Sequence, residues 1–197
     1  MIDFCTISLN EIKALKIDEK EVMRYLGVKE LDNSLKVMYE ACVSKVYEAS
    51  APKAIFRKLN ISVLDNTVDF GFMKVNSNDL AKNLRDCKEA YVFAATLGIG
   101  IDRAFERLNR ISQAEAMVFS AVASSLIESF CDYVNEQLIV DLCARPRFSA
   151  GYGDFSLQHQ KDILNYLEAD KRLGICLTDS YMMVPVKSVT AIIGIRS

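Results

Sequence analysis

The chain has 197 residues, of which 51% are hydrophobic and 25% are charged, and its formal net charge is −2. This length and composition predict one domain with a substantial buried core. The slight excess of negative charge excludes a nucleic-acid-binding protein that depends on a basic surface, because the lysines and arginines form no long run.

The first 50 residues are predicted to form a helical arm. Asp18 is placed to cap a short helix that reaches about residue 26, and Gly27 ends it. A longer helix is expected over residues 31–48, because apolar residues recur there at helical spacing. Pro52 stops this part of the chain.

Strands and helices alternate in the middle of the chain. Residues 61–64 and 67–70 alternate in polarity on either side of an Asp-Asn turn, which predicts a β-hairpin entered from a strand at 54–59. A capped helix at 77–84, a buried strand at 90–97 and a helix at 101–108 are expected to follow.

The last third begins with a long helical pattern over residues 112–142. A glycine-containing loop follows, and Ser156 is placed to cap a helix over residues 157–169. Two strands are expected at 175–184 and 187–195, because both stretches are rich in β-branched residues.

The mixed order of these elements predicts an α+β fold. We expect a twisted, mainly antiparallel sheet with surrounding helices, in a single domain over residues 1–197. The run Gly98-Ile99-Gly100 does not extend to the G-x-G-x-x-G pattern, so a dinucleotide-binding fold is not expected.

The cysteines and the start of the chain indicate a cytoplasmic protein. Six cysteines occur without a C-x-x-C pair, and His159 is the single histidine, so we predict no metal site. The chain does not begin with a basic stretch followed by an apolar one, so no secretory signal is expected. We therefore expect free, mostly buried thiols, and no membrane-spanning segment.

The most informative stretch is the loop over residues 147–155. Arg147 carries the forked group that binds carboxylates, and Gly151 allows a ligand to approach the backbone closely. With Tyr152 as a wall, the loop is interpreted as a pocket for a small molecule that carries a carboxylate. The alternative is a surface arginine in a glycine-containing loop.

Glu128 is a second candidate, on the long predicted helix. Ser124 lies one turn before it and Asp132 one turn after it, so the three share a polar face. A carboxylate on that face suits a ligand with a positive group. The alternative is the solvated stripe of an amphipathic helix.

Other polar residues near the end of the chain have two interpretations each. Thr178, Asp179 and Ser180 interrupt an apolar strand, and they either face a ligand or alternate toward solvent. Lys187 either helps to dock a partner or is an exposed lysine.

Tyr181, Met182 and Met183 either adapt to a partner surface or belong to the core. His159 is expected on the surface, and no Ser/His/Asp or Cys/His catalytic set is supported.

Two runs, residues 147–155 and 177–189, resemble in this order the activation domain of cobalamin-dependent methionine synthase. The S-adenosylmethionine-binding motif of that family is Arg-x-x-x-Gly-Tyr, which Arg147, Gly151 and Tyr152 match in full. The similarity is strongest over residues 126–195.

The chain also departs from the family. It has Ala150 where a proline is common and Asp179 where a glutamate is usual. It contains no D-x-H-x-x-G motif, so the resemblance implies that a partner protein, not this chain, carries the cobalamin.

The resemblance implies a stand-alone reactivation domain. It would bind S-adenosylmethionine through Arg147, Gly151, Tyr152, Glu128 and Ala150 and support, in trans, the reductive methylation of cob(II)alamin. Its partners would be a corrinoid protein and flavodoxin or a similar electron donor, and it would be a component of a methyltransferase activity rather than a complete enzyme. The departures leave one alternative, a docking or assembly protein for a corrinoid protein that binds no S-adenosylmethionine.

Overall fold

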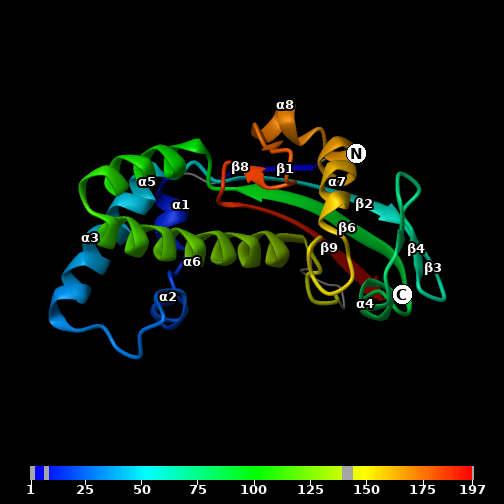
Figure 1. The fold of residues 1–197 in the computed structure, drawn as a ribbon. Coiled ribbons are helices and arrows are strands. Elements are labelled where there is room, and N and C mark those ends of the chain that lie inside the picture. The colour runs from blue at the N-terminus through cyan, green and yellow to red at the C-terminus, as the bar shows by residue number, and fades with distance from the viewer. Residues whose placement is uncertain (1–2, 7–8, 139–143, 197) are drawn as a thin grey trace.

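A four-stranded antiparallel sheet forms the middle layer of the structure, a computed structural model that describes residues 3–6, 9–138 and 144–196 (Figure 1). Its strands lie side by side in the order β1 (Asp3–Thr6), β2 (Lys53–Asn60), β6 (Cys87–Thr96) and β9 (Ser188–Arg196). The central strand β6 pairs with β2 on one side and with β9 on the other. The sheet therefore joins the beginning, middle and end of the chain.

Helices cover one face of this sheet: α1 (Leu9–Ala14), α2 (Glu19–Leu26), α3 (Asn33–Ala49), α5 (Ile99–Ile111) and α6 (Gln113–Leu138) (Figure 1). Helix α6 packs against α2, α3 and α5, and its side chains Phe119 and Phe130 are fully buried. The predicted caps of α2 are confirmed, since Asp18 accepts the backbone N–H of Lys20 and Gly27 has a φ of 69°.

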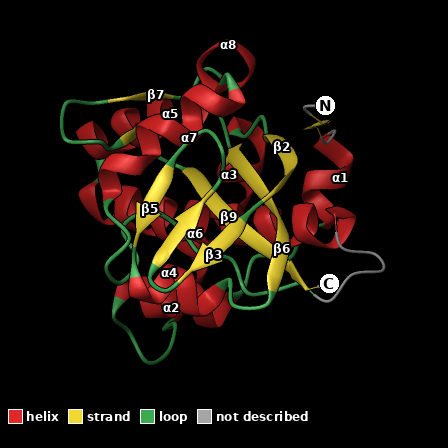
Figure 2. Ribbon diagram, turned by 90° about the vertical axis from the view of Figure 1, so that its right-hand side faces the viewer, coloured by secondary structure: helices red, strands yellow, loops and turns green. Residues whose placement is uncertain are grey.

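A smaller set of elements covers the opposite face: the 3-10 turn η1 (Leu157–His159), α7 (Gln160–Leu167), α8 (Ala169–Leu173) and α4 (Asn78–Asn83). Three strands form a second sheet, β3 (Ser62–Leu64), β4 (Thr67–Asp69) and β5 (Lys74–Asn76), at one end of the central sheet (Figure 1), and they lie in front of it in Figure 2. A two-stranded hairpin, β7 (Cys176–Leu177) and β8 (Met183–Val184), precedes β9.

Strand β6 is buried on both faces, which explains its continuous apolar sequence. Phe93 and Ala95 belong to the core under α6, whereas Val92 and Ala94 belong to the core under α7. Side chains alternate along a strand, so each helical layer receives every second residue. The α+β prediction is confirmed by this arrangement.

Three local predictions differ from the structure. Residues 3–6, expected in a helical arm, form β1, which pairs with β2 about 50 residues later in the chain. The expected strand 175–184 consists of two short strands around a turn. The expected helix 157–169 is interrupted at Glu168, whose φ is 53°. The predicted end of the long helix, in residues 139–143, lies outside the described residues.

Within the described residues, only the segment Gln113–Glu136 of α6 is long and apolar enough to cross a membrane. An 18-residue window of this segment has a mean hydropathy of 1.3, and 61% of that window is buried in the protein. The core helix of a folded domain has the same properties, and the packing of α6 against three helices and the sheet explains them.

Candidate functional site

Arg147 lies at the edge of the sheet, beside β9. The segment that leads to it runs along β9, because Arg145 donates its backbone N–H to Gly194 at 2.8 Å and Phe148 exchanges two backbone hydrogen bonds of 2.9 Å with Ile192. These bonds fix the backbone on both sides of Arg147. The guanidinium is thereby held against the C-terminal half of α6.

The structure brings Arg147 and Glu128 together, although 18 residues separate them in the chain. One guanidinium nitrogen lies 2.9 Å from Glu128 Oε2 and another lies 2.9 Å from Asp132 Oδ1. The side chain of Arg147 is 19% exposed, that of Glu128 is 37% exposed and that of Asp132 is 66% exposed. The polar face predicted for α6 is therefore real, and it faces the arginine of the motif.

The environment of Glu128 disfavours its negative charge. Burial raises the pKa of Glu128 above its ordinary value, and the carboxylates of Glu21 and Asp132 raise it further. The guanidinium of Arg147 opposes this rise without cancelling it. A positive group placed beside Glu128 would therefore be stabilised there.

Helix α2 supplies a wall of this site that the sequence did not reveal. The backbone N–H of Asp18 donates to Ser125 Oγ at 2.9 Å, and Ser129 Oγ donates to the carbonyl of Lys16 at 2.6 Å, so the start of α2 is fixed on α6. Burial raises the pKa of Tyr25, and the carboxylates of Glu21 and Glu128 raise it further. No local pattern in the sequence signals that α2 lies against this part of α6.

The loop after Arg147 is compact. Gly151 has a φ of 94°, a conformation that residues with a Cβ rarely adopt, and its N–H donates to the carbonyl of Phe155 at 2.7 Å. Tyr152 is 56% exposed, and its ring meets that of Phe148 edge to face at 6.0 Å. The side chain of Ala150 is buried in the opposite core, so it does not face the Arg147 side of the sheet.

Asp154 anchors this loop to the N-terminus of α4, a role that the sequence did not reveal. Its carboxylate accepts a hydrogen bond from the Ser77 hydroxyl and from the backbone N–H of Asn78 at 2.7 Å and of Asp79 at 3.2 Å. These bonds hold the pKa of Asp154 below its ordinary value, with the Ser77 hydroxyl as the largest cause. In return, Asp154 donates its own N–H to Asp79 Oδ2 at 3.3 Å.

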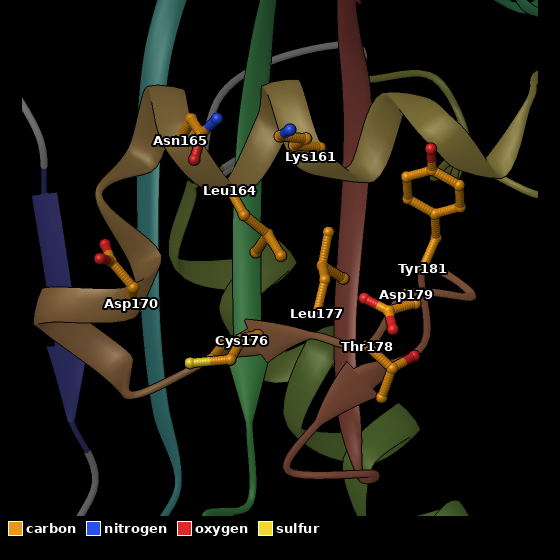
Figure 3. Close-up of a pocket in the computed structure, with 10 residues that line it drawn as sticks. Lys161, Leu164, Asn165, Asp170, Cys176, Leu177, Thr178, Asp179 and Tyr181 are labelled. Carbon is orange, nitrogen blue, oxygen red and sulfur yellow. The ribbon is translucent and has the colours of Figure 1, made fainter.

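A separate cavity of about 450 Å³ lies among α7, α8 and the β7–β8 hairpin (Figure 3). Thr178 and Asp179 line it, Ser180 does not, and all three are exposed, so the structure leaves both interpretations of these residues open. The close-up shows Leu164 and Leu177 in its middle, with Asp170 and Asp179 on opposite sides (Figure 3). No residue of the Arg147 site contributes to this cavity.

The remaining candidate residues lie at separate places in the structure. Lys187 is half-buried rather than exposed, because its ammonium turns inward to α6. Met183 packs against the core, whereas Met182 is 57% exposed. Tyr181 lines the cavity of Figure 3. His159 has an acidic neighbour that the sequence reading missed, since Asp162 lies 3.4 Å from its Nδ1.

The described cysteines are free thiols, as expected, and Cys143 lies outside the described residues. Burial raises the pKa of Cys42 to about 11 and that of Cys131 to about 12, so both remain protonated at neutral pH. In the described part of the chain, no three His, Cys, Asp or Glu side chains gather as a metal site would require.

Comparison with known proteins adds a relationship at the level of the fold. No family model matches the chain, and no curated protein matches its sequence. A solved structure, described as the crystal structure of the MetH reactivation domain bound to AdoHcy, superimposes with a TM-score of 0.73. The chain has the fold of the MetH reactivation domain. The match covers 98% of this chain and 78% of the other, at 13% sequence identity, so it confirms the fold that the sequence resemblance implied.

Proposed function

We propose that this protein binds S-adenosylmethionine (AdoMet) at the Arg147 site and acts in trans as a cytoplasmic reactivation domain for a corrinoid protein. The observation that carries the proposal is the coincidence of two features. The fold is that of a domain whose solved structure holds AdoHcy, and the Arg-x-x-x-Gly-Tyr motif lies where Arg147 meets Glu128.

Arg147 is the anchor for the carboxylate of the ligand. Its partner Asp132 is 66% exposed, and an ion pair between exposed groups contributes only about 0–1 kcal/mol. Replacing Asp132 with a ligand carboxylate therefore costs the protein little stability, and the ligand gains a forked hydrogen bond to the guanidinium. The more buried Glu128 stays beside the guanidinium and keeps it oriented.

Glu128 favours the positive end of the ligand. AdoMet carries an ammonium and a sulfonium, and either would relieve the cost of the partly buried carboxylate of Glu128. Tyr152 of the loop and Tyr25 of α2 are both exposed aromatic side chains that a ligand could contact. Gly151 permits the positive φ that closes the loop onto Phe155, where a Cβ would lie 3.2 Å from a methyl carbon of Leu157.

The contribution of this chain would be to position the bound methyl donor. When bound, AdoMet supplies an electrophilic methyl group, while the cobalamin and the electrons would come from a corrinoid protein and from flavodoxin or a similar donor. Holding the methyl donor at a fixed orientation on a rigid sheet edge reduces the entropy that a methyl transfer between proteins must lose. The backbone hydrogen bonds between Phe148 and β9, and the hydrogen bonds between Asp154 and the N-terminus of α4, provide that rigidity.

Calorimetry with AdoMet and AdoHcy tests the proposal. We expect the wild type to bind both, and Arg147→Met to lose at least about 1.5 kcal/mol, the scale of a hydrogen bond to a charged group, or more than tenfold in affinity. Arg103→Met is the matched control, since Arg103 is an exposed arginine of α5, outside the site. Equal affinity in wild type and Arg147→Met would remove this arginine from the site.

The alternative, a docking protein that binds no AdoMet, is favoured by one observation. Arg147 already has two carboxylate partners within the chain, so the ion pairs hold the loop without a ligand. This alternative predicts no thermal stabilisation by AdoMet and binding to a corrinoid protein that is unaffected by Arg147→Met.

A further inference from the structure

A second, smaller cavity of about 120 Å³ lies between α5, α6 and the segment that leads into β9. Its volume corresponds to about four water molecules, at about 30 Å³ each. Seven residues line it: Ile101, Asp102, Phe105, Phe119, Ser120, Val186 and Lys187. On α6, its lining residue Ser120 lies about two turns, or about 12 Å along the helix axis, before Glu128, and Asp132 lies a further turn on, so the cavity is separate from the Arg147 site.

Lys187 brings a hydrogen-bond donor to this cavity. Its ammonium donates to Ser124 Oγ at 2.7 Å and to Ser120 Oγ at 3.1 Å. An ammonium has three N–H groups, and no carboxylate among the described residues lies within 4 Å of this one. Burial lowers the pKa of Lys187, an effect that Asp102 partly opposes. One donor of a half-buried cation is thus left for an acceptor that the chain does not provide.

Asp102 brings an acceptor to the same cavity. Its Oδ1 accepts the backbone N–H of Val186 at 3.0 Å, which fixes the carboxylate. Its Oδ2 is buried and has no hydrogen-bond partner in the described part of the chain. A buried carboxylate oxygen without a donor is unfavourable, so this atom lacks an N–H or O–H group beside it.

We infer that this cavity is a binding site for a primary carboxamide group. A carboxamide carries an acceptor oxygen for Lys187 and donor N–H groups for Asp102 on a planar group, and a short aliphatic stem fits against Ile101, Phe105 and Phe119. A carboxylate satisfies the lysine but is repelled by Asp102. An ammonium satisfies the aspartate but is repelled by the lysine. The carboxamide alone among these groups complements both.

Exposed apolar side chains surround the position of this cavity in the fold. Val186 is 61% exposed, Met117, one turn before Ser120 on α6, is 62% exposed, and Ile99, one turn before Asp102 on α5, is 42% exposed. A larger molecule that presents a carboxamide can therefore rest on an apolar rim. The group has two sources: the amide side chains at the edge of a corrin ring, which rests on the proposed function, or an Asn or Gln side chain of a protein partner.

Titration of the ¹⁵N-labelled protein with propionamide and with propionate tests the cavity. We expect propionamide to shift the amide signals of Asp102 and Val186 and to bind at least tenfold more tightly than propionate. Lys187→Met should weaken propionamide at least tenfold. Lys161→Met, in the cavity of Figure 3, is the matched control and should leave binding unchanged.

Asp102→Asn gives a sharper test. The new amide keeps an oxygen for the Val186 N–H and places N–H donors where Oδ2 lacked a partner, so the cavity then offers two donors. Its preference should reverse, with propionate binding more tightly than propionamide. Equal responses to both probes in the wild type, or an unchanged preference in Asp102→Asn, would show a cavity that holds only water and would overturn the inference.

A third titration separates the two sources. Cobinamide, whose corrin carries primary amides, should compete with propionamide if the corrinoid supplies the group, and a corrin whose amides are hydrolysed to carboxylates should not. Competition by a glutamine-containing peptide but not by cobinamide assigns the group to a protein partner and leaves the cavity inference standing. AdoMet calorimetry on the same samples shows separately whether the proposed function holds.

Discussion

Gly151 offers the clearest test of how the loop geometry serves the site. The residue has a φ of 94°, and a Cβ added there would lie 3.2 Å from a methyl carbon of Leu157. A residue with a Cβ in the left-handed region costs about 1–2 kcal/mol. For a chain of this length, each kcal/mol lowers the melting temperature by about 2–4 °C. Gly151→Ala should therefore melt about 2–8 °C below the wild type.

Gly71→Ala separates the loss of stability from the loss of binding. Gly71 has a φ of 79° with nothing within 4 Å of an added Cβ, so an alanine there adds backbone strain outside the Arg147 loop. We expect both variants to lose similar stability in thermal unfolding, and Gly151→Ala alone to lose the stabilisation by AdoMet. If Gly151→Ala keeps the AdoMet shift of the wild type, or if Gly71→Ala loses it as well, the loop conformation does not control the site.

Three further predictions follow from burial and charge. Burial lowers the pKa of Lys187, so the folded protein releases the ammonium proton at a lower pH than the unfolded chain does. The wild type should therefore gain stability relative to Lys187→Met as the pH rises toward about 10.4, the ordinary pKa of lysine. Urea unfolding at several pH values measures this difference. Burial raises the pKa of Glu128, so AdoMet should bind more weakly as the pH falls through that pKa, and calorimetry in two buffers should detect proton release that Glu128→Gln abolishes. Phe119→Ala should lower the free energy of unfolding by about 3–5 kcal/mol, because Phe119 is fully buried, and a loss below about 1 kcal/mol in urea unfolding would contradict its place in the core.

Elements with strong local signals were predictable from the sequence. Asp18 and Gly27 cap the two ends of α2 as expected, and Ser77 caps α4 by accepting the backbone N–H of Leu80. The apolar run of β6 is recognisable because each of its faces meets a separate core. These features depend on neighbouring residues, which a single sequence displays.

Elements that depend on distant contacts were not predictable. β1 has four residues and exists because it pairs with β2, so it carries no pattern long enough to distinguish it from a helix. Likewise, helical spacing indicated the polar face of Glu128, but only the fold shows the start of α2 fixed beside it. The inward turn of Lys187 depends on Ser120 and Ser124, more than 60 residues earlier in the chain.

A crystal structure of the protein grown with AdoHcy tests the central claim most directly. The account predicts the ligand at the edge of β9, with its carboxylate within hydrogen-bonding distance of the Arg147 guanidinium in place of Asp132, and with its ammonium facing Glu128. A ligand bound elsewhere, or an Arg147 that keeps both Glu128 and Asp132 in the presence of saturating AdoHcy, would contradict it.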